Sequence, residues 1–202
     1  MNGVVLISGN GSNLQSIIDN AKSIDLNICC VVSNKKDAFG LKRAAKASIP
    51  CIALDETLFD SKLGFDQEIM KVIDNYQAEV IILAGYMRIL SADFISKYSG
   101  KILNIHPSLL PKFPGLNTHQ RAIDASEKKH GASVHFVTEE VDGGPVIAQQ
   151  FVNIDSTDNS QTLAKKVLEK EHVLYPQVIR WYTQGRLKLL NNKTVILDRK
   201  TI

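Results

Sequence analysis

Asn104 and His106 lie two residues apart in the short segment Asn104-Ile105-His106-Pro107. If this segment is a strand, the alternation of side chains places both on the same face. A histidine can act as an acid or a base near neutral pH, and an amide beside it can donate a hydrogen bond to a developing oxyanion. The pair favours acyl transfer, although a histidine that only satisfies backbone groups at a strand end would leave the same pattern.

Asp142 is a candidate acidic partner for this histidine. It lies in the run Glu139-Glu-Val-Asp-Gly-Gly, whose two glycines let the backbone approach another element closely. Asp-Gly is also a common hairpin turn, so a structural role and a catalytic role stay equally open. If Asp142 contacts His106, its negative charge would raise the pKa of the histidine and favour the imidazolium.

A glycine loop near the start of the chain suggests an anion site. The run Gly9-Asn10-Gly11-Ser12-Asn13 follows an apolar segment and precedes a helical pattern. In that context backbone N–H groups and a helix N-terminus can hold a phosphate. Leu14 stands where a dinucleotide fingerprint needs glycine or alanine, which disfavours NAD. We predict a monophosphate at Gly11, Ser12 and Asn13; the alternative is a tight turn that only starts a helix.

The elements that must position these residues alternate between short apolar runs and longer amphipathic ones. Buried strands are predicted over residues 4–8, 27–33, 51–54, 80–84 and 102–105, with helical patterns between them, one of which begins at Ser91 as N-cap. This order predicts an α/β fold: a Rossmann-like, mainly parallel sheet with helices on both faces. Ligands bind beyond the carboxyl ends of such strands.

The character of the chain changes after Pro107. A proline-rich loop leads to a predicted helix over 118–128, and β segments over 132–138 and 146–154 are joined by a turn, which predicts an antiparallel pair in the C-terminal half. A long helix is expected from about Ser160, interrupted near Pro176, and a hairpin about Asn191-Asn192 closes the chain.

Composition narrows the function classes. The 24 basic and 21 acidic residues give a net charge of +3 without a polybasic block, so nothing demands a nucleic-acid or membrane partner. The first residues lack the basic region and the length of a signal peptide, and the expected compartment is the cytoplasm. No metal site is expected, because the histidines show no ligand spacing. The thiols of Cys29, Cys30 and Cys51 should be reduced, and His119, His130 and His135 should be structural.

Several motifs together resemble the folate-dependent formyltransferases. They are NIHPSLLPKFPG at 104–115, GASVHFV at 131–137 and VDGGPVI at 141–147. The opening VVLISGNGSNLQSII, the run AGYMRIL at 84–90 and the segment KEHVLYP at 170–176 are similar to the branch that acts on a phosphoribosylglycinamide. The resemblance covers nearly the whole chain. It implies transfer of the formyl group of 10-formyltetrahydrofolate to the amine of 5'-phosphoribosylglycinamide, a step of purine biosynthesis, and no metal.

The resemblance also implies roles for particular residues. One formyltransferase domain is expected over 1–202, with a phosphate-binding half at 1–100 and a catalytic and folate-binding half at 101–202. Lys62 departs from the arginine common in relatives, and lysine keeps the charge but loses the planar fork. The implied catalytic residues are Asn104, His106 as proton donor and Asp142; the phosphoribosylglycinamide site is Gly11, Ser12, Asn13 and Glu171; the folate site is Lys62, Met87, Arg88, Ile89, Leu90, Asn104, Val137 and Val141.

Other functions remain as alternatives. A 10-formyltetrahydrofolate hydrolase would use water in place of the amine, and the resemblance implies that it carries a regulatory domain before the catalytic one. A methionyl-tRNA formyltransferase would carry a basic C-terminal domain. A non-catalytic nucleotide-binding module would keep the glycine loop without a reason to keep Asn104, His106 and Asp142 together. Small-molecule substrates and a monomer or weak homodimer are expected.

Overall fold

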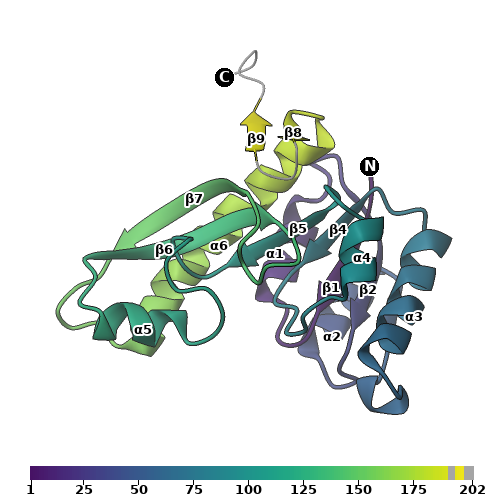
Figure 1. The fold of residues 1–202 in the computed structure, drawn as a ribbon, viewed down its shortest axis with the longest axis horizontal. Helices are drawn as coiled ribbons and strands as arrows, with labels where there is room; N and C mark the ends of the chain where they lie inside the picture. The colour runs from purple at the N-terminus through teal and green to yellow at the C-terminus, as the bar shows by residue number, and fades with distance from the viewer. Residues whose placement is uncertain (191–193, 198–202) are drawn as a thin grey trace. The chain divides into compact units, whose positions relative to one another are not determined.

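A computed structural model describes residues 1–190 and 194–197 of the chain (Figure 1). The chain divides into two compact units, Met1–Leu103 and Asn104–Ile202. The boundary falls inside strand β5 (Ile102–His106), so the first residues of this strand belong to one unit and its last residues to the other.

The first unit alternates strands and helices, as predicted. Its sheet has the order β3-β2-β1-β4, followed by the start of β5. Strand β1 pairs in parallel with β2 on one side and with β4 on the other, and β2 pairs in parallel with β3. The elements are β1 (Asn2–Ile7), α1 (Ser12–Asn20), β2 (Asn27–Ser33), α2 (Phe39–Lys46), β3 (Cys51–Ala53), the 3-10 helix η1 (Glu56–Leu58), α3 (Lys62–Asn75), β4 (Val80–Leu83) and α4 (Ala92–Lys97).

Local chemistry explains where these elements lie. All four residues of β4 are buried, as is most of β1, which is why both read as continuous apolar runs rather than as alternating ones. The hydroxyl of Ser91 accepts a hydrogen bond from the N–H of Phe94 at 3.3 Å and begins α4. Ser61 caps α3 in the same way through the N–H of Gly64, at 3.0 Å. The predicted cap at Ser91 is therefore confirmed.

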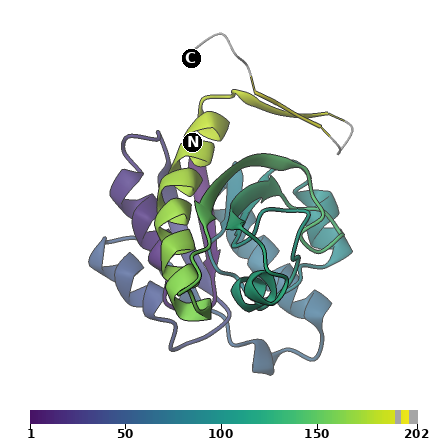
Figure 2. The same cartoon turned by 90° about the vertical axis from the view of Figure 1, so that its left-hand side faces the viewer.

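Helices cover both faces of the first unit's sheet. Helix α1 contacts α2, whereas α3 contacts α4. The strand order runs outward from β1 to β3 and then returns to β4, so right-handed crossovers place the two helix pairs on opposite faces, as Figure 2 shows. The order reverses between β1 and β4, and the carboxyl ends of these two strands therefore frame a crevice suited to a ligand.

The second unit adds the antiparallel strands. The end of β5 is followed in the sheet by β6 (Lys129–Phe136) and β7 (Val146–Asn153), which pair in antiparallel fashion as predicted. Helix α6 (Ser160–Thr183) packs on both β6 and β7. Strands β8 (Leu187–Leu190) and β9 (Thr194–Leu197) form a separate antiparallel pair, and the turn predicted at Asn191-Asn192 lies outside the described residues.

Two details of the second unit correct the sequence interpretation. Helix α6 continues through Pro176 and is not interrupted there. Leu174, Tyr175 and Val178 around the proline are buried, and this burial outweighs the hydrogen bond that proline cannot make. Helix α5 (Thr118–Asp124) ends earlier than predicted, so His130 lies within β6 instead of at a helix end.

Many of the apolar side chains are buried in the core of the protein. Among residues 1–190 and 194–197, no helix combines the length and the apolar composition needed to cross a membrane. Leu14 of α1 is completely buried, whereas Leu58 of η1 keeps 75% of its surface exposed.

These two leucines form a matched pair for a stability test. Leu14→Ala should lower the free energy of unfolding by about 2–5 kcal/mol, because it leaves a cavity in the core. Leu58→Ala should change it by about 0.5 kcal/mol or less. Urea unfolding followed by circular dichroism measures both values. Equal effects of the two substitutions would contradict the burial described for α1.

Candidate functional site

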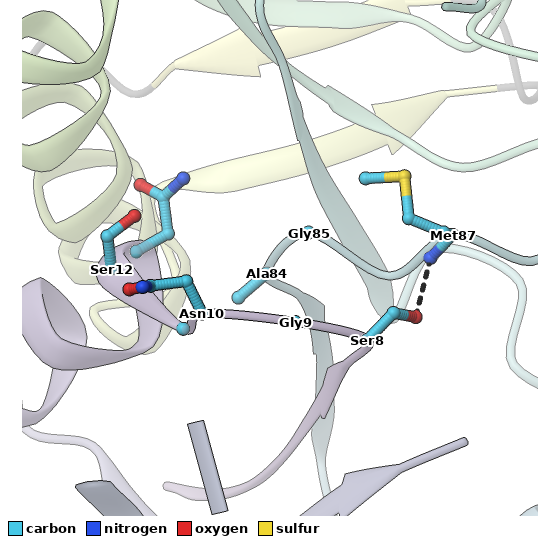
Figure 3. A pocket seen from close by; sticks show the side chains of 9 residues that line it. Ser8, Gly9, Asn10, Ser12, Ala84, Gly85 and Met87 are labelled. Atoms are coloured by element: carbon cyan, nitrogen blue, oxygen red, sulfur yellow. Dashed lines mark hydrogen bonds between the residues drawn. The ribbon is translucent and has the colours of Figure 1, made fainter. Parts of the chain in front are cut away.

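A pocket of about 230 Å³ lies at the carboxyl ends of β1 and β4 (Figure 3). One wall is the glycine loop and the first turn of α1, and the other is the segment that follows β4. The strand-end position agrees with the expectation for an open parallel sheet. The lining residues are Ser8, Gly9, Asn10, Gly11, Ser12, Asn13, Ala84, Gly85 and Met87.

Gly11 shapes this loop. Its φ is +74°, in the left-handed region, and it is the residue that precedes α1. A Cβ on Gly11 would lie 2.7 Å from the Cα of Gly40, because α2 packs directly behind the loop. The N–H of Gly40 also donates to the carbonyl of Gly9 at 3.0 Å. The backbone approach therefore requires glycine, as a loop that holds a ligand with its own N–H groups would.

Arg43 of α2 is an anchor that sequence reasoning missed. Its Nε donates to the carbonyl of Asn10 and its Nη2 to the side-chain oxygen of Asn10, both at 2.9 Å. Nη1 donates to Gln15 of α1 at 3.2 Å. One guanidinium thus ties the loop to the start of the helix that follows. No local pattern marked it, because Arg43 and Asn10 are 33 residues apart in sequence.

The segment predicted to contact folate alternates between inward and outward side chains. Met87 is 64% exposed and Ile89 is 59% exposed, whereas Leu90 is buried. The guanidinium of Arg88 pairs with the carboxylate of Glu56 and is mostly covered. The Nζ of Lys62 donates to the carbonyl of Leu90 at 3.2 Å.

His106 lies at the end of β5, only 6% exposed, with an acceptor at each ring nitrogen. Its Nε2 is 2.9 Å from the carbonyl oxygen of Phe113, and its Nδ1 is 3.3 Å from Oδ2 of Asp142. The structure therefore brings these two predicted residues together. Because a carbonyl and a carboxylate can only accept, a proton on both ring nitrogens satisfies both contacts.

Asn104 joins the same cluster through His135. The Nδ1 of His135 faces the carbonyl of Phe136 at 2.9 Å and therefore donates to it, which leaves Nε2 to accept from Nδ2 of Asn104 at 3.1 Å. The same Nε2 lies 3.6 Å from Oδ1 of Asp142. His135, which the sequence interpretation treated as structural, thus lies between the amide and the carboxylate. Side chains alternate along β6, so His135 lies on the same face as Ser133. This shared face could have indicated from the sequence that His135 points toward the site.

The electrostatics of the cluster set burial against charge. Burial lowers the pKa of His106 below its usual value, while the carbonyl of Phe113 and the negative charge of Asp142 raise it. Burial raises the pKa of Asp142, but the hydrogen bond from the N–H of Gly115 and the neighbouring His106 hold it below the usual range. Asp142 is therefore charged at neutral pH. The expectation that Asp142 raises the pKa of His106 holds for its own contribution, but the net shift is downward.

Buried hydroxyl groups hold the loop that covers this cluster. The Oγ of Ser133 accepts from the N–H of Leu110 at 3.0 Å and donates to the carbonyl of Ser108 at 2.6 Å. Gln149 of β7 donates to the same Oγ at 2.8 Å. Thr118 closes the loop by donating to the carbonyl of Pro107 at 2.7 Å. The carbonyl of Phe113 is thus presented to His106 by a fixed loop.

The remaining predicted residues lie in the second unit. Glu171 is buried in α6, Val137 follows β6 directly and is half-buried, and Val141 is exposed in the loop before β7. The rings of His119 and His130 lie 5.2 Å apart, and burial lowers the pKa of both, that of His130 to about 4. Within the described residues, no group of three or more His, Cys, Asp or Glu side chains is arranged to hold a metal ion.

Comparison with known proteins shows the family to which this chain belongs. A family model described as formyl transferase matches residues 1–179. Phosphoribosylglycinamide formyltransferase of Escherichia coli (strain K12) is 52% identical over 194 residues, which are 95% of this chain and 92% of that protein. The protein of the same name from Haemophilus influenzae is 48% identical over 98% of this chain and 94% of its own length.

Solved structures agree. The phosphoribosylglycinamide formyltransferase of Coxiella burnetii, determined in complex with CHES, matches with a TM-score of 0.94 and 48% identity. The match covers 98% of this chain and 93% of that one. The predicted α/β fold, mainly parallel with antiparallel strands in the C-terminal half, is therefore confirmed.

The glycine loop offers a second matched pair. Gly11→Ala should lower the free energy of unfolding by about 1–3 kcal/mol, because alanine is strained at positive φ and its Cβ meets the backbone of Gly40. Gly9→Ala is the control, since nothing lies within 4 Å of a Cβ there and its φ is not positive. Thermal and urea unfolding measure both. A Gly11→Ala protein as stable as the control would disprove the close approach.

Asp142→Asn tests the charge beside His106. Burial continues to lower the pKa of His106 in the variant, while the negative charge that raises it is lost, so this pKa should fall below its value in the unmodified protein. An NMR titration of the ring Cε1 protons measures it. Asp124→Asn, at an exposed position of α5, should leave it unchanged. An unchanged or higher pKa of His106 in Asp142→Asn would contradict the contact.

Proposed function

We propose a reaction for this chain on the basis of its family. The chain belongs to the formyl transferase family. It transfers the formyl group of 10-formyltetrahydrofolate to the amine of 5'-phosphoribosylglycinamide, giving formylglycinamide ribonucleotide and tetrahydrofolate in purine biosynthesis. The observation that carries the chemistry is the cluster of a buried imidazole, an amide and a charged carboxylate at the end of β5. These groups suit direct acyl transfer without a covalent enzyme intermediate.

Asn104 and His106 are the proposed stabilisers of the oxyanion. The amide nitrogen of Asn104 carries two N–H groups, and His135 takes one of them. The other is available to the formyl oxygen as it gains negative charge. With Nδ1 of His106 facing Asp142, Nε2 is the nitrogen that donates to the substrate, and the formyl oxygen takes the place of the Phe113 carbonyl.

Asp142 has a supporting role in this proposal. Its charge favours the imidazolium of His106 against the burial that disfavours it, so the histidine gains a proton most readily when negative charge develops beside it. His106 or water then moves the proton from the attacking amine to the folate nitrogen that leaves. His135 holds the amide of Asn104 and lies beside Asp142, which keeps the two groups in register.

The substrate contacts are proposals as well. Gly11, Ser12 and Asn13 hold the ribose phosphate, supported by their place in the strand-end pocket at the start of α1. Glu171 receives the glycinamide amine. The folate contacts the exposed side chains and the backbone of the segment Met87 to Leu90. The resemblance also implies Val137 and Val141 as folate contacts. Lys62, whose ammonium already reaches the carbonyl of Leu90, provides the cation for a folate carboxylate.

Asn104→Ala tests the oxyanion role. We expect kcat to fall about 10²-fold to 10³-fold, the usual cost of one oxyanion donor, and His106→Ala to be at least as severe. Asn153→Ala, at an exposed position of β7, should keep normal turnover. Absorbance of the deformylated folate measures the rate, and circular dichroism checks that each variant folds. Near-normal turnover of a folded Asn104→Ala protein would refute the assignment.

The same absorbance assay separates the alternatives. Folate release that requires phosphoribosylglycinamide identifies the transferase, whereas release without it identifies the hydrolase. Phosphate binding without any release would leave the non-catalytic module. The transferase is favoured because the relatives described above carry that name. A cytoplasmic location and a monomer or weak homodimer remain proposals; the unpaired thiols of Cys29, Cys30 and Cys51 support the location.

A further inference from the structure

A ring of polar contacts lies behind the segment proposed to bind folate. It starts at the backbone N–H of Met87, which donates to Oγ of Ser8 at 2.8 Å (Figure 3). The Ser8 hydroxyl donates in turn to Oδ1 of Asn34 at 2.6 Å. The amide of Asn34 reaches Oε1 of Glu56 at 3.4 Å.

Glu56 closes the ring. Its second oxygen, Oε2, accepts from Nη1 of Arg88, the residue next to Met87. The ring thus leaves the segment at one residue and returns to it at the next. Ser8 and Asn34 are buried, so each can satisfy its polar atoms only inside this network. A chain of this kind fixes both the backbone of Met87 and the side chain of Arg88.

The outer side of the segment is held from helix α3. The Arg88 guanidinium lies over the ring of Phe65, 4.3 Å from its centroid. Asp66 accepts from the N–H of Ser91 at 2.7 Å, and Lys62 donates to the carbonyl of Leu90. Every residue from Met87 to Ser91 except Ile89 therefore has a named polar anchor in the first unit.

Glu56 supplies the carboxylate that pairs with Arg88 in this ring, and it therefore determines where the guanidinium lies. With Glu56 in place, the guanidinium turns inward and its charge is balanced, while the side chains of Met87 and Ile89 face solvent. Without the carboxylate, a cation on a mobile side chain and an unpaired amide of Asn34 would remain beneath the segment.

We propose that Glu56 is a positioning residue for the folate substrate: through Arg88 and Asn34 it holds the segment Met87 to Leu90 in the conformation that binds the folate. The inference rests on the proposed function, since it concerns the folate site of that reaction. It differs from the role that the family resemblance gives Arg88, because the guanidinium acts on the segment from behind and does not touch the ligand.

Glu56→Gln tests the proposal, because glutamine keeps the size of the side chain and loses its charge. Titration calorimetry with 10-formyltetrahydrofolate alone should give a dissociation constant about tenfold higher than that of the unmodified protein. KM for the folate should rise by a similar factor, while kcat and KM for phosphoribosylglycinamide change less than about threefold. A purely structural role would lower stability without this separation.

Glu68→Gln is the matched control. Glu68 also pairs with a cation, Lys71, at 2.5 Å, but it does so on the exposed surface of α3 and makes no contact with the ring. The same chemical change there should leave folate binding unaffected. Equal weakening in the two variants would overturn the specific role of Glu56.

A double-mutant cycle tests whether Glu56 acts through Arg88. Arg88→Met should weaken folate binding to about the same extent as Glu56→Gln, and the double variant should be no weaker than Arg88→Met alone. Independent, additive losses would show that Glu56 or Arg88 contacts the folate directly and would overturn the inference.

The binding experiment also separates this inference from the proposed function. If the unmodified protein binds 10-formyltetrahydrofolate and Glu56→Gln binds it equally well, the positioning role fails and the formyl transfer stands. If the unmodified protein neither binds the folate nor releases tetrahydrofolate in the presence of phosphoribosylglycinamide, the proposed function fails and takes the inference with it.

Discussion

A polar side chain that folding takes out of water must find its hydrogen-bond partners inside the protein, and this constraint shapes both the cluster at the end of β5 and the ring of contacts behind Met87. In the second unit the two nitrogens of His106 meet a carbonyl and a carboxylate. In the first unit Ser8 and Asn34 find their partners in a ring that ends at Arg88. Buried hydrogen-bond networks of this kind hold groups in one geometry, which binding and catalysis require.

The cluster at the end of β5 shows how burial and charge compete. Burial disfavours the imidazolium of His106, while Asp142 and the Phe113 carbonyl favour it, and burial prevails in the free protein. A substrate that develops negative charge beside Nε2 would shift this balance toward the protonated form. In the proposed reaction the histidine therefore need not be permanently charged, because negative charge that develops on the substrate would favour its protonation.

The strand order gives these networks their place. Because β1 lies between β2 and β4 with all three parallel, the loops after β1 and β4 emerge at the same edge and form the two walls of one pocket. The glycine loop can lie there because Gly11 and Gly40 allow α2 to pack against it. The ring behind Met87 uses the same neighbours, since Ser8 follows β1 and Asn34 follows β2.

The sequence by itself determined the alternation of strands and helices, the cap at Ser91, the glycine loop and the common face of Asn104 and His106, because these depend on side-chain period and on neighbours within a few residues. Tertiary structure decided the rest. The contact of Met87 with Ser8 spans 79 residues and that of Arg88 with Glu56 spans 32, so no local pattern carries either. The inward turn of Arg88, the place of His135 in the cluster, the continuation of α6 through Pro176 and the downward pKa of His106 all depend on burial. Burial is a property of the packed fold, which brings distant segments together, and it exists only once the chain has folded.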